Sequence, residues 1–114
     1  MISVAVIGGG ASGMAFAVAL KQKRPDIEVT VFEKNPKVLK KILVTGNGRC
    51  NILNFDAVAE NYFEACEFVR PAVEKYAPKK TEAIFRDMGL LLMSEQEGRE
   101  YPISQTAASV VCVL

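Results

Sequence analysis

The sequence predicts an α/β protein that opens with a βαβ unit. An apolar, β-branched run over residues 2–7 ends at glycine, and an Ala-, Met- and Leu-rich stretch follows over 11–22. A second strand-like run, EVTVFE (28–33), comes after Pro25-Asp26. Buried parallel strands are near-continuous apolar runs, and they are usually joined by a helix with a right-handed crossover. Ala, Met and Leu favour that helix and the Pro-Asp pair ends it.

The residues after this unit predict a loop and then two helices. Residues 34–54 hold five Lys or Arg residues and no Asp or Glu, and their glycines and asparagines favour a loop. Apolar residues recur at helical spacing over 56–76, where Pro71 is expected to kink or end the helix. A shorter helix is expected over 79–88, with Gly89 as its C-terminal cap.

The last part of the chain predicts a small β-hairpin and a final helix. Strands over 90–93 and 99–102 flank the polar turn SEQEG, and Ser104 is expected to cap a helix that still continues at Leu114. Two strands cannot bury both faces of a parallel sheet, so we expect either that the βαβ unit is a fragment of a longer fold or that later segments complete it in an unusual way. Tyr101 and several residues on the helix faces are expected in the core: Phe63, Phe68, Ile84 and Phe85.

The composition excludes several classes of function. Half of the residues are hydrophobic and the net charge is +1, which predicts a globular protein without a basic surface for nucleic acid. Three cysteines without a CxxC pair, and no histidine, argue against a metal site and exclude a His-dependent triad. Glycines interrupt the first apolar run, so we expect no signal peptide and no membrane segment. The odd cysteine set predicts a cytoplasmic protein.

The glycine-rich loop between strand and helix predicts a dinucleotide site. Gly8-Gly9-Gly10-Ala11-Ser12-Gly13 fits the pattern GxGxxG in the required setting. Gly8 permits a tight turn, Gly10 lets a pyrophosphate approach the backbone, and Gly13 lets the helix pack closely on the strand. The N–H groups at the start of the helix can then bind phosphate. The alternative is a glycine-rich turn of another α/β protein.

Glu33 supports the dinucleotide interpretation. A carboxylate at the end of the second strand can accept hydrogen bonds from the ribose hydroxyls and repels a 2′-phosphate. The pattern does not distinguish FAD from NAD. The basic stretch and the following TGNGRCN leave two interpretations open, a solvated loop built for its turns or a loop whose amides and guanidinium contact a ligand.

Four segments, GGGASG, FEKN, KKILVTGNGRCN and GREYPISQTAASVVCVL, resemble the BaiN/RdsA-type bacterial flavoproteins, which are NAD(P)/FAD-dependent oxidoreductases of the glutathione-reductase-like FAD class. The resemblance covers essentially the whole chain. It implies that residues 1–54 are the first part of a Rossmann-like FAD-binding domain with the GNGRCN loop. Residues 55–114 would be a helical and hairpin segment that leads into an inserted domain of a longer protein. FAD is the implied cofactor and NAD(P)H a possible electron donor.

The resemblance also implies roles for individual residues. Residues at the FAD pyrophosphate would be Gly8, Gly10, Ala11, Ser12 and Gly13. Glu33 would bind the adenosine ribose, with Lys34 beside it. Residues toward the pyrophosphate or the flavin would be Lys41, Gly46, Arg49, Cys50 and Asn51. The sequence departs from the family pattern at Leu39 and Leu53, where Gly and Thr are expected.

No catalytic residue is assigned from the sequence. Cys50 lacks a neighbouring cysteine, and a single thiol cannot form the internal disulfide that a flavin disulfide reductase uses. We therefore expect a small cysteine that is packed or lies beside the flavin. The resemblance implies the N-terminal FAD-binding part of an oxidoreductase that transfers hydride between NAD(P)H or a substrate and FAD. Two alternatives remain, an NAD-binding regulatory module and a truncated product without function.

Overall fold

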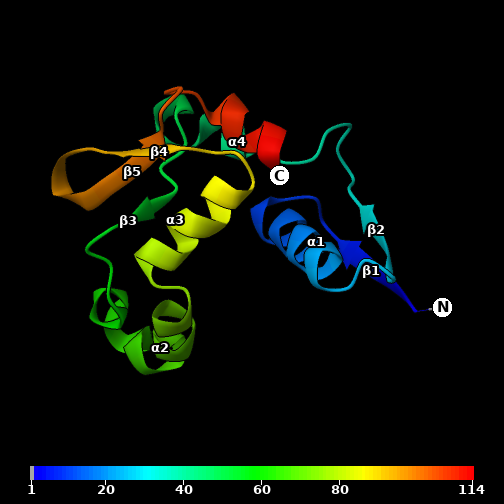
Figure 1. The fold of residues 1–114 in the computed structure, drawn as a ribbon, viewed down its shortest axis with the longest axis horizontal. Helices are drawn as coiled ribbons and strands as arrows, with labels where there is room; N and C mark the ends of the chain where they lie inside the picture. Colours follow the sequence, from blue (N-terminus) through cyan, green and yellow to red (C-terminus); the bar gives the residue numbers. More distant parts are fainter. Residues whose placement is uncertain (1) are drawn as a thin grey trace.

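The computed structural model describes residues 2–114, which form two parts placed side by side in Figure 1. The first part is the predicted βαβ unit, made of β1 (Ser3–Ile7), α1 (Ala11–Lys23) and β2 (Glu28–Phe32). The two strands pair in parallel, from Ser3 opposite Glu28 to Ile7 opposite Phe32. The predicted order of strand, helix and strand is therefore confirmed.

The two faces of this sheet have different surroundings. Side chains alternate between the faces of a strand, so one face carries the valines of both strands and packs on α1. The opposite face carries Ile7 and Phe32, which are 83% and 55% exposed. Parallel sheets are normally covered on both faces, so residues 2–114 supply half of the usual cover.

The second part is built on a three-stranded antiparallel sheet. Its strands are β3 (Leu53–Asn54), β4 (Leu92–Ser94) and β5 (Arg99–Pro102), in the order β3-β5-β4. The pairing of β4 with β5 confirms the predicted hairpin, whose turn contains the short 3-10 segment η3 (Gln96–Gly98). β3 is too short to show the alternating pattern of a strand, and residues 53–54 were expected in a loop.

The prediction of a single helix over residues 56–76 is wrong. The chain forms a 3-10 segment, η2 (Ala59–Ala65), and then α2 (Cys66–Lys75), because Phe63 adopts φ +50° and ψ −121° and interrupts the helical backbone. Pro71 lies inside α2 and does not end it. The apolar face assumed for one continuous helix does not exist, so Phe63 and Phe68 are 85% and 89% exposed and lie outside the core.

Helix α3 (Pro78–Asp87) confirms the next prediction within one residue at each end. It ends in a Schellman motif, in which the N–H of Gly89 bonds Arg86 O (2.9 Å) and that of Leu90 bonds Phe85 O (2.9 Å). Gly89 has φ +92°, a conformation that glycine adopts far more readily than other residues, which explains why glycine occupies this position.

The last helix, α4 (Ala107–Val113), is capped by Thr106 and not by Ser104. The Thr106 hydroxyl accepts a hydrogen bond from Ala108 N at 3.3 Å. Ser104 lies in a turn closed by the bond from Gln105 N to Pro102 O (2.9 Å), so the helix begins later than expected. No helix within residues 2–114 combines the length and the apolar character that crossing a membrane requires.

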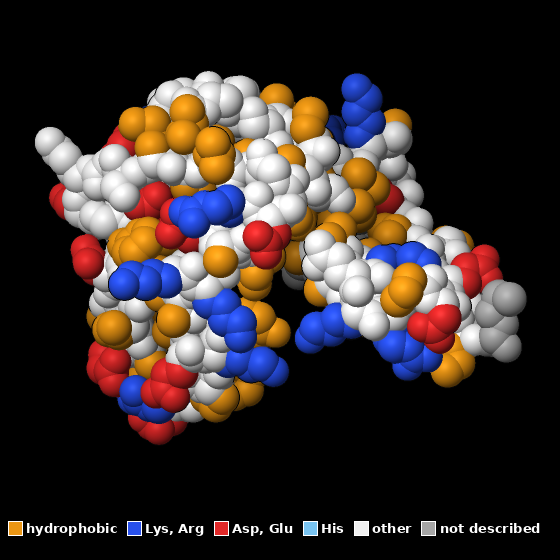
Figure 2. Space-filling model, in the orientation of Figure 1, with side chains coloured by type: hydrophobic (Ala, Val, Ile, Leu, Met, Phe, Trp, Pro, Cys, Tyr) orange, Lys and Arg blue, Asp and Glu red, His pale blue; other side chains and the backbone are white. Residues whose placement is uncertain are grey.

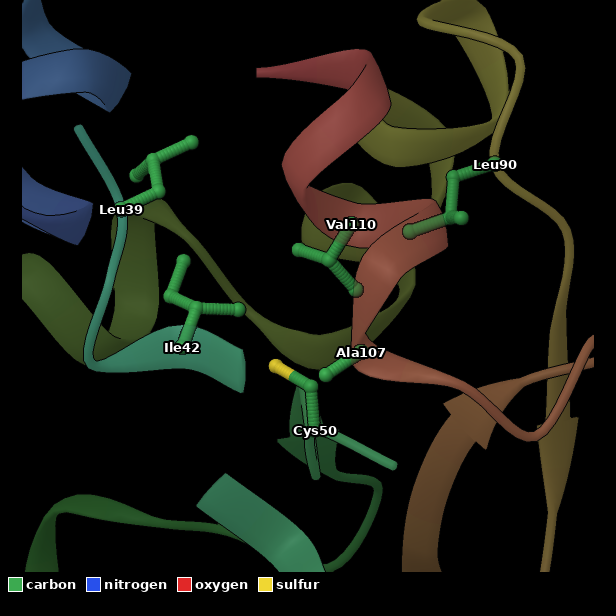
Figure 3. Close-up of a cluster of buried hydrophobic side chains, with 6 residues drawn as sticks. All are labelled: Leu39, Ile42, Cys50, Leu90, Ala107 and Val110. Carbon is green, nitrogen blue, oxygen red and sulfur yellow. The ribbon is translucent and has the colours of Figure 1, made fainter. Parts of the chain in front are cut away.

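The main core joins segments that are distant in sequence (Figure 3). Residues from the chain after β2 meet residues that precede β4 or belong to α4: Leu39, Ile42, Cys50, Leu90, Ala107 and Val110. This cluster and the β3–β5 pair connect both sides of the division expected at residue 54. That division stays a prediction.

Candidate functional site

The glycines of the loop between β1 and α1 differ in whether the backbone or the packing requires them. Gly8 has φ +97°, a conformation that side-chain-bearing residues rarely adopt. A Cβ on Gly13 would lie 2.1 Å from Gly8 O and 3.3 Å from Val6 Cγ1, so the close packing of α1 on β1 requires glycine there. Gly10 differs from both: its φ of −80° suits any residue, and a Cβ there would meet no atom within 4 Å. Neither backbone nor packing within residues 2–114 therefore requires the glycine at position 10.

Gly10 precedes the first turn of α1, a place that suits an anion. Gly10 is the N-cap of α1 and has no side chain to bond the first N–H groups of the helix. The first turn also contains no acidic residue whose carboxylate could accept hydrogen bonds from these N–H groups. The N–H groups that follow Gly10, together with the helix dipole, can therefore bind a phosphate.

The chain after β2 folds back over the glycine loop. Leu39 N donates a hydrogen bond to Gly9 O at 2.7 Å, and Val38 lies so close to Gly9 that a Cβ there would be 2.5 Å from Val38 Cγ1. Leu39 has φ +59° and is only 2% exposed. This left-handed backbone explains why the resembling family is expected to have glycine at this position, whereas here the burial of the leucine side chain offsets the strain.

Glu33 is held in place at the end of β2. Its Oε2 accepts a hydrogen bond from Gly9 N (2.8 Å), and its Oε1 accepts two bonds from Asn35, one from N (2.8 Å) and one from Nδ2 (2.7 Å). The bonds from the Asn35 and Gly9 backbone and then from the Asn35 side chain hold the pKa of Glu33 below its ordinary value of 4.5. The nearby Lys34 contributes in the same direction. Glu33 is therefore a carboxylate at neutral pH.

A cavity of about 520 Å³ lies between the glycine loop and the chain after β2. This volume is in the range of small-molecule sites. The cavity brings together six of the residues predicted from the sequence: Gly10, Ala11, Ser12, Glu33, Lys34 and Lys41. Gly8 and Gly13 do not line it, and they shape the loop beneath it.

Sequence reasoning missed other residues that line the same cavity: Gly9, Asn35, Lys37, Leu39, Lys40, Ile42 and Thr45. The spacing of the lysines in KNPKVLKK was a usable signal, because the loop brings all four of them to the cavity. Four ammonium groups and one carboxylate give the cavity wall a positive balance that suits a bound anion. Figure 2 shows one face of the molecule, on which Lys, Arg, Asp and Glu side chains are spread over both parts.

The GNGRCN segment has a different environment. Its first three residues end a kinked 3-10 segment, η1 (Ile42–Gly48), and Gly46, Asn47, Gly48 and Cys50 all have positive φ. A Cβ on Gly46 would lie 2.5 Å from Asn51 N, so the loop folds tightly on itself. None of Gly46, Arg49, Cys50 and Asn51 lines the cavity.

The side chains of Arg49 and Cys50 point into the protein. The Arg49 guanidinium bonds Glu95 Oε1 at 2.6 Å and Gln105 Oε1 at 2.8 Å, and lies over the ring of Tyr101, which is 5% exposed. Cys50 is buried in the main core, as expected for a packed cysteine (Figure 3). Within residues 2–114 the loop is therefore tied to β5 and α4 by its side chains.

Comparison with known proteins agrees with this geometry. Residues 2–114 match the model of the HI0933-like protein Rossmann domain. The chain is 39% identical over 115 residues to the 3-dehydro-bile acid delta(4,6)-reductase of Clostridium scindens. The aligned region covers 100% of this chain and 28% of that protein. It is 28% identical over 95 residues to the ribosomal RNA dihydrouridine synthase of Haemophilus influenzae, covering 82% of this chain and 23% of that protein.

A shorter match covers less than a third of the chain. The salicyloyl-CoA 5-hydroxylase of a Streptomyces species is 56% identical over 34 residues, which is 30% of this chain and 7% of that protein. The chain spans about a quarter of the length of the two relatives that it matches over most of its own length. The resemblance to BaiN/RdsA-type flavoproteins is confirmed, as is the α/β fold class. This chain belongs to the HI0933-like protein Rossmann domain family.

Proposed function

We propose that this chain binds the adenosine diphosphate part of FAD and belongs to a flavin-dependent oxidoreductase. The observation that carries the proposal is Gly10, whose missing side chain serves neither the backbone nor the packing of residues 2–114. A phosphate that approaches the start of α1 would need that space. The family resemblance supports FAD over NAD as the dinucleotide.

The pyrophosphate and the ribose of the ligand each have matching residues in the cavity. The pyrophosphate would lie on the first N–H groups of α1, at Ala11 and Ser12, with the loop lysines Lys34 and Lys41 neutralising its charge. A ribose hydroxyl would donate a hydrogen bond to Glu33, which is anionic at neutral pH and therefore repels a 2′-phosphate.

The remaining members of the predicted site would act indirectly. Gly46, Arg49 and Cys50 would shape the GNGRCN loop, and Asn51, which is exposed, could reach the flavin from that loop. When bound, FAD supplies the hydride chemistry, which we propose runs between NAD(P)H or a substrate and the flavin. The protein residues described here bind and orient the cofactor, and we assign none of them as an acid or base.

A binding experiment tests the proposal. Titrations of the purified protein with ADP, FAD and NAD⁺, followed by calorimetry and flavin fluorescence, should show that ADP and FAD compete for one site. Gly10→Ala should weaken binding and Gly10→Val should abolish it, while the thermal midpoint stays within about 2 °C of the wild type, since a side chain at position 10 meets open space.

Other results would favour other functions. Binding of NAD⁺ without binding of FAD would favour an NAD-binding regulatory module. Unchanged ADP binding by Gly10→Val would contradict the proposed site. We also propose the cytoplasm as the compartment, because Cys50, Cys66 and Cys112 are all free thiols.

A further inference from the structure

We propose that Asn35 is a positioning residue for Glu33 that fixes the carboxylate for recognition of the ribose hydroxyls. This inference rests on the proposed function and deepens it, because it names the residue on which the ribose contact depends. Asn35 follows Glu33 by two residues and lines the same cavity. The sequence pattern of a dinucleotide site does not include it.

The hydrogen bonds around Glu33 show how Asn35 acts. A carboxylate offers about four acceptor positions. Asn35 occupies two of them through its N and Nδ2 atoms on Oε1, and Gly9 N occupies one on Oε2. The carboxylate plane is thus fixed from both oxygens, with one acceptor position still unfilled. A hydroxyl that donates to this position meets a group whose orientation is already set, so binding costs little side-chain entropy.

The charges around the cavity explain why a neutral donor matters here. The charged side chains that share the cavity wall with Glu33 are Lys34, Lys37, Lys40 and Lys41. A carboxylate without fixed partners can turn toward one of these ammonium groups and form an ion pair. The amide of Asn35 supplies a hydrogen bond without a charge, so it holds Glu33 in place and leaves the lysines available for phosphate.

The experiment separates positioning from a general effect on the cavity. ADP and 2′,3′-dideoxy-ADP are titrated into the wild type, Asn35→Ala and Asn35→Asp. The wild type should bind ADP on the order of tenfold more tightly than the dideoxy ligand, since a hydrogen bond to a charged group is lost. Asn35→Ala should weaken ADP binding on the order of threefold to tenfold. Its affinity for dideoxy-ADP should stay within about twofold of that of the wild type. Asn35→Asp, which has the same shape but replaces the amide donor with a second carboxylate, should also lose the preference, and its negative charge should weaken the binding of both ligands.

A matched control and a second readout complete the test. Asn61→Ala removes an exposed asparagine whose Oδ1 accepts a bond from Val58 N (2.8 Å) outside this cavity, so it should leave both affinities unchanged. NMR titration of the Glu33 carboxyl should give a higher pKa in Asn35→Ala than in the wild type or Asn61→Ala, because one bond to the charged form is lost.

Each contrary outcome has a distinct meaning. Equal weakening of both ligands by Asn35→Ala or an unchanged Glu33 pKa would overturn this inference alone. A wild type that does not prefer ADP over dideoxy-ADP would overturn the proposed contact between Glu33 and the ribose, and this inference with it, but not the proposed phosphate site at the start of α1. A wild type that binds neither ligand would overturn the proposed function and the inference together.

Discussion

The guanidinium of Arg49 stacks on the ring of Tyr101, with 4.0 Å between the guanidinium carbon Cζ and the ring centroid. The same guanidinium bonds Glu95 and Gln105, which lie on either side of β5 in sequence. A residue of the GNGRCN loop, expected from the resemblance to contact the cofactor directly, thus attaches that loop to the antiparallel sheet. Four positive-φ residues around Arg49 make the loop dependent on such an attachment.

Replacing Arg49 tests this attachment. Arg49→Ala should lower the free energy of unfolding by about 1–3 kcal/mol, because it removes the stacking on Tyr101 and leaves the half-buried Glu95 unpaired. Arg49→Lys keeps the charge but lacks the planar group, so it should lie between alanine and the wild type. Urea denaturation measures both. Arg24→Ala is the matched control, since its ion pair with Asp26 is exposed and should contribute little. An equal loss in the two alanine variants would contradict the prediction.

Replacing Leu39 by glycine should change the unfolding free energy differently from the same substitution at an ordinary core leucine. Leu39→Ala removes a side chain that is 2% exposed and should cost about 2–5 kcal/mol of unfolding free energy. Glycine is normally worse than alanine, but φ at this position is +59°, where a Cβ costs about 1–2 kcal/mol. Leu39→Gly should therefore be at least as stable as Leu39→Ala. Ile42→Gly and Ile42→Ala, in the same core at an ordinary φ, should show the usual order. Thermal and urea unfolding of the four variants decide this.

The buried carboxyl of Glu100 should make Ser94 important for stability. Glu100 is 2% exposed in the central strand β5, and the Ser94 hydroxyl donates a hydrogen bond to its Oε1. Ser94→Ala should destabilise the protein by about 1–3 kcal/mol, because it leaves a buried acceptor without this donor. The double variant Ser94→Ala/Glu100→Leu removes both groups and should recover part of the loss. Urea unfolding curves that show no coupling between the two positions would contradict this account.

Glu33 should make stability depend on acid pH. Its hydrogen bonds hold its pKa in the folded protein below the ordinary value of 4.5, so folding favours the charged form. The stabilisation is then complete above pH 4.5 and is lost as the pH falls through the lower, folded-state pKa. Thermal midpoints of the wild type should fall more steeply than those of Glu33→Gln over this acid range. Asp26, Glu60 and Glu67 also have lowered pKa values, but both proteins contain them, so their effect cancels in the difference.

Local sequence patterns predicted the elements whose physical cause is local. The βαβ unit follows from apolar runs and a Pro-Asp break, and the end of α3 follows from one glycine at Gly89. The prediction over 56–76 failed because a single residue, Phe63, adopts a positive φ that no property of a phenylalanine indicates. The cap of α4 was displaced from Ser104 to Thr106 by a turn whose bond from Gln105 to Pro102 could not be anticipated.

The sequence by itself determined the glycine loop and the acid after β2, because GxGxxG and Glu33 act through a turn, a helix start and a strand end that are close in sequence. Only the tertiary structure decided what surrounds them. It folded residues 34–45 over Gly9 to make the cavity and turned Arg49 and Cys50 toward the second part of the molecule. These arrangements depend on packing between segments that are far apart in the chain. A sequence pattern records such packing only where it imposes a glycine or a charge.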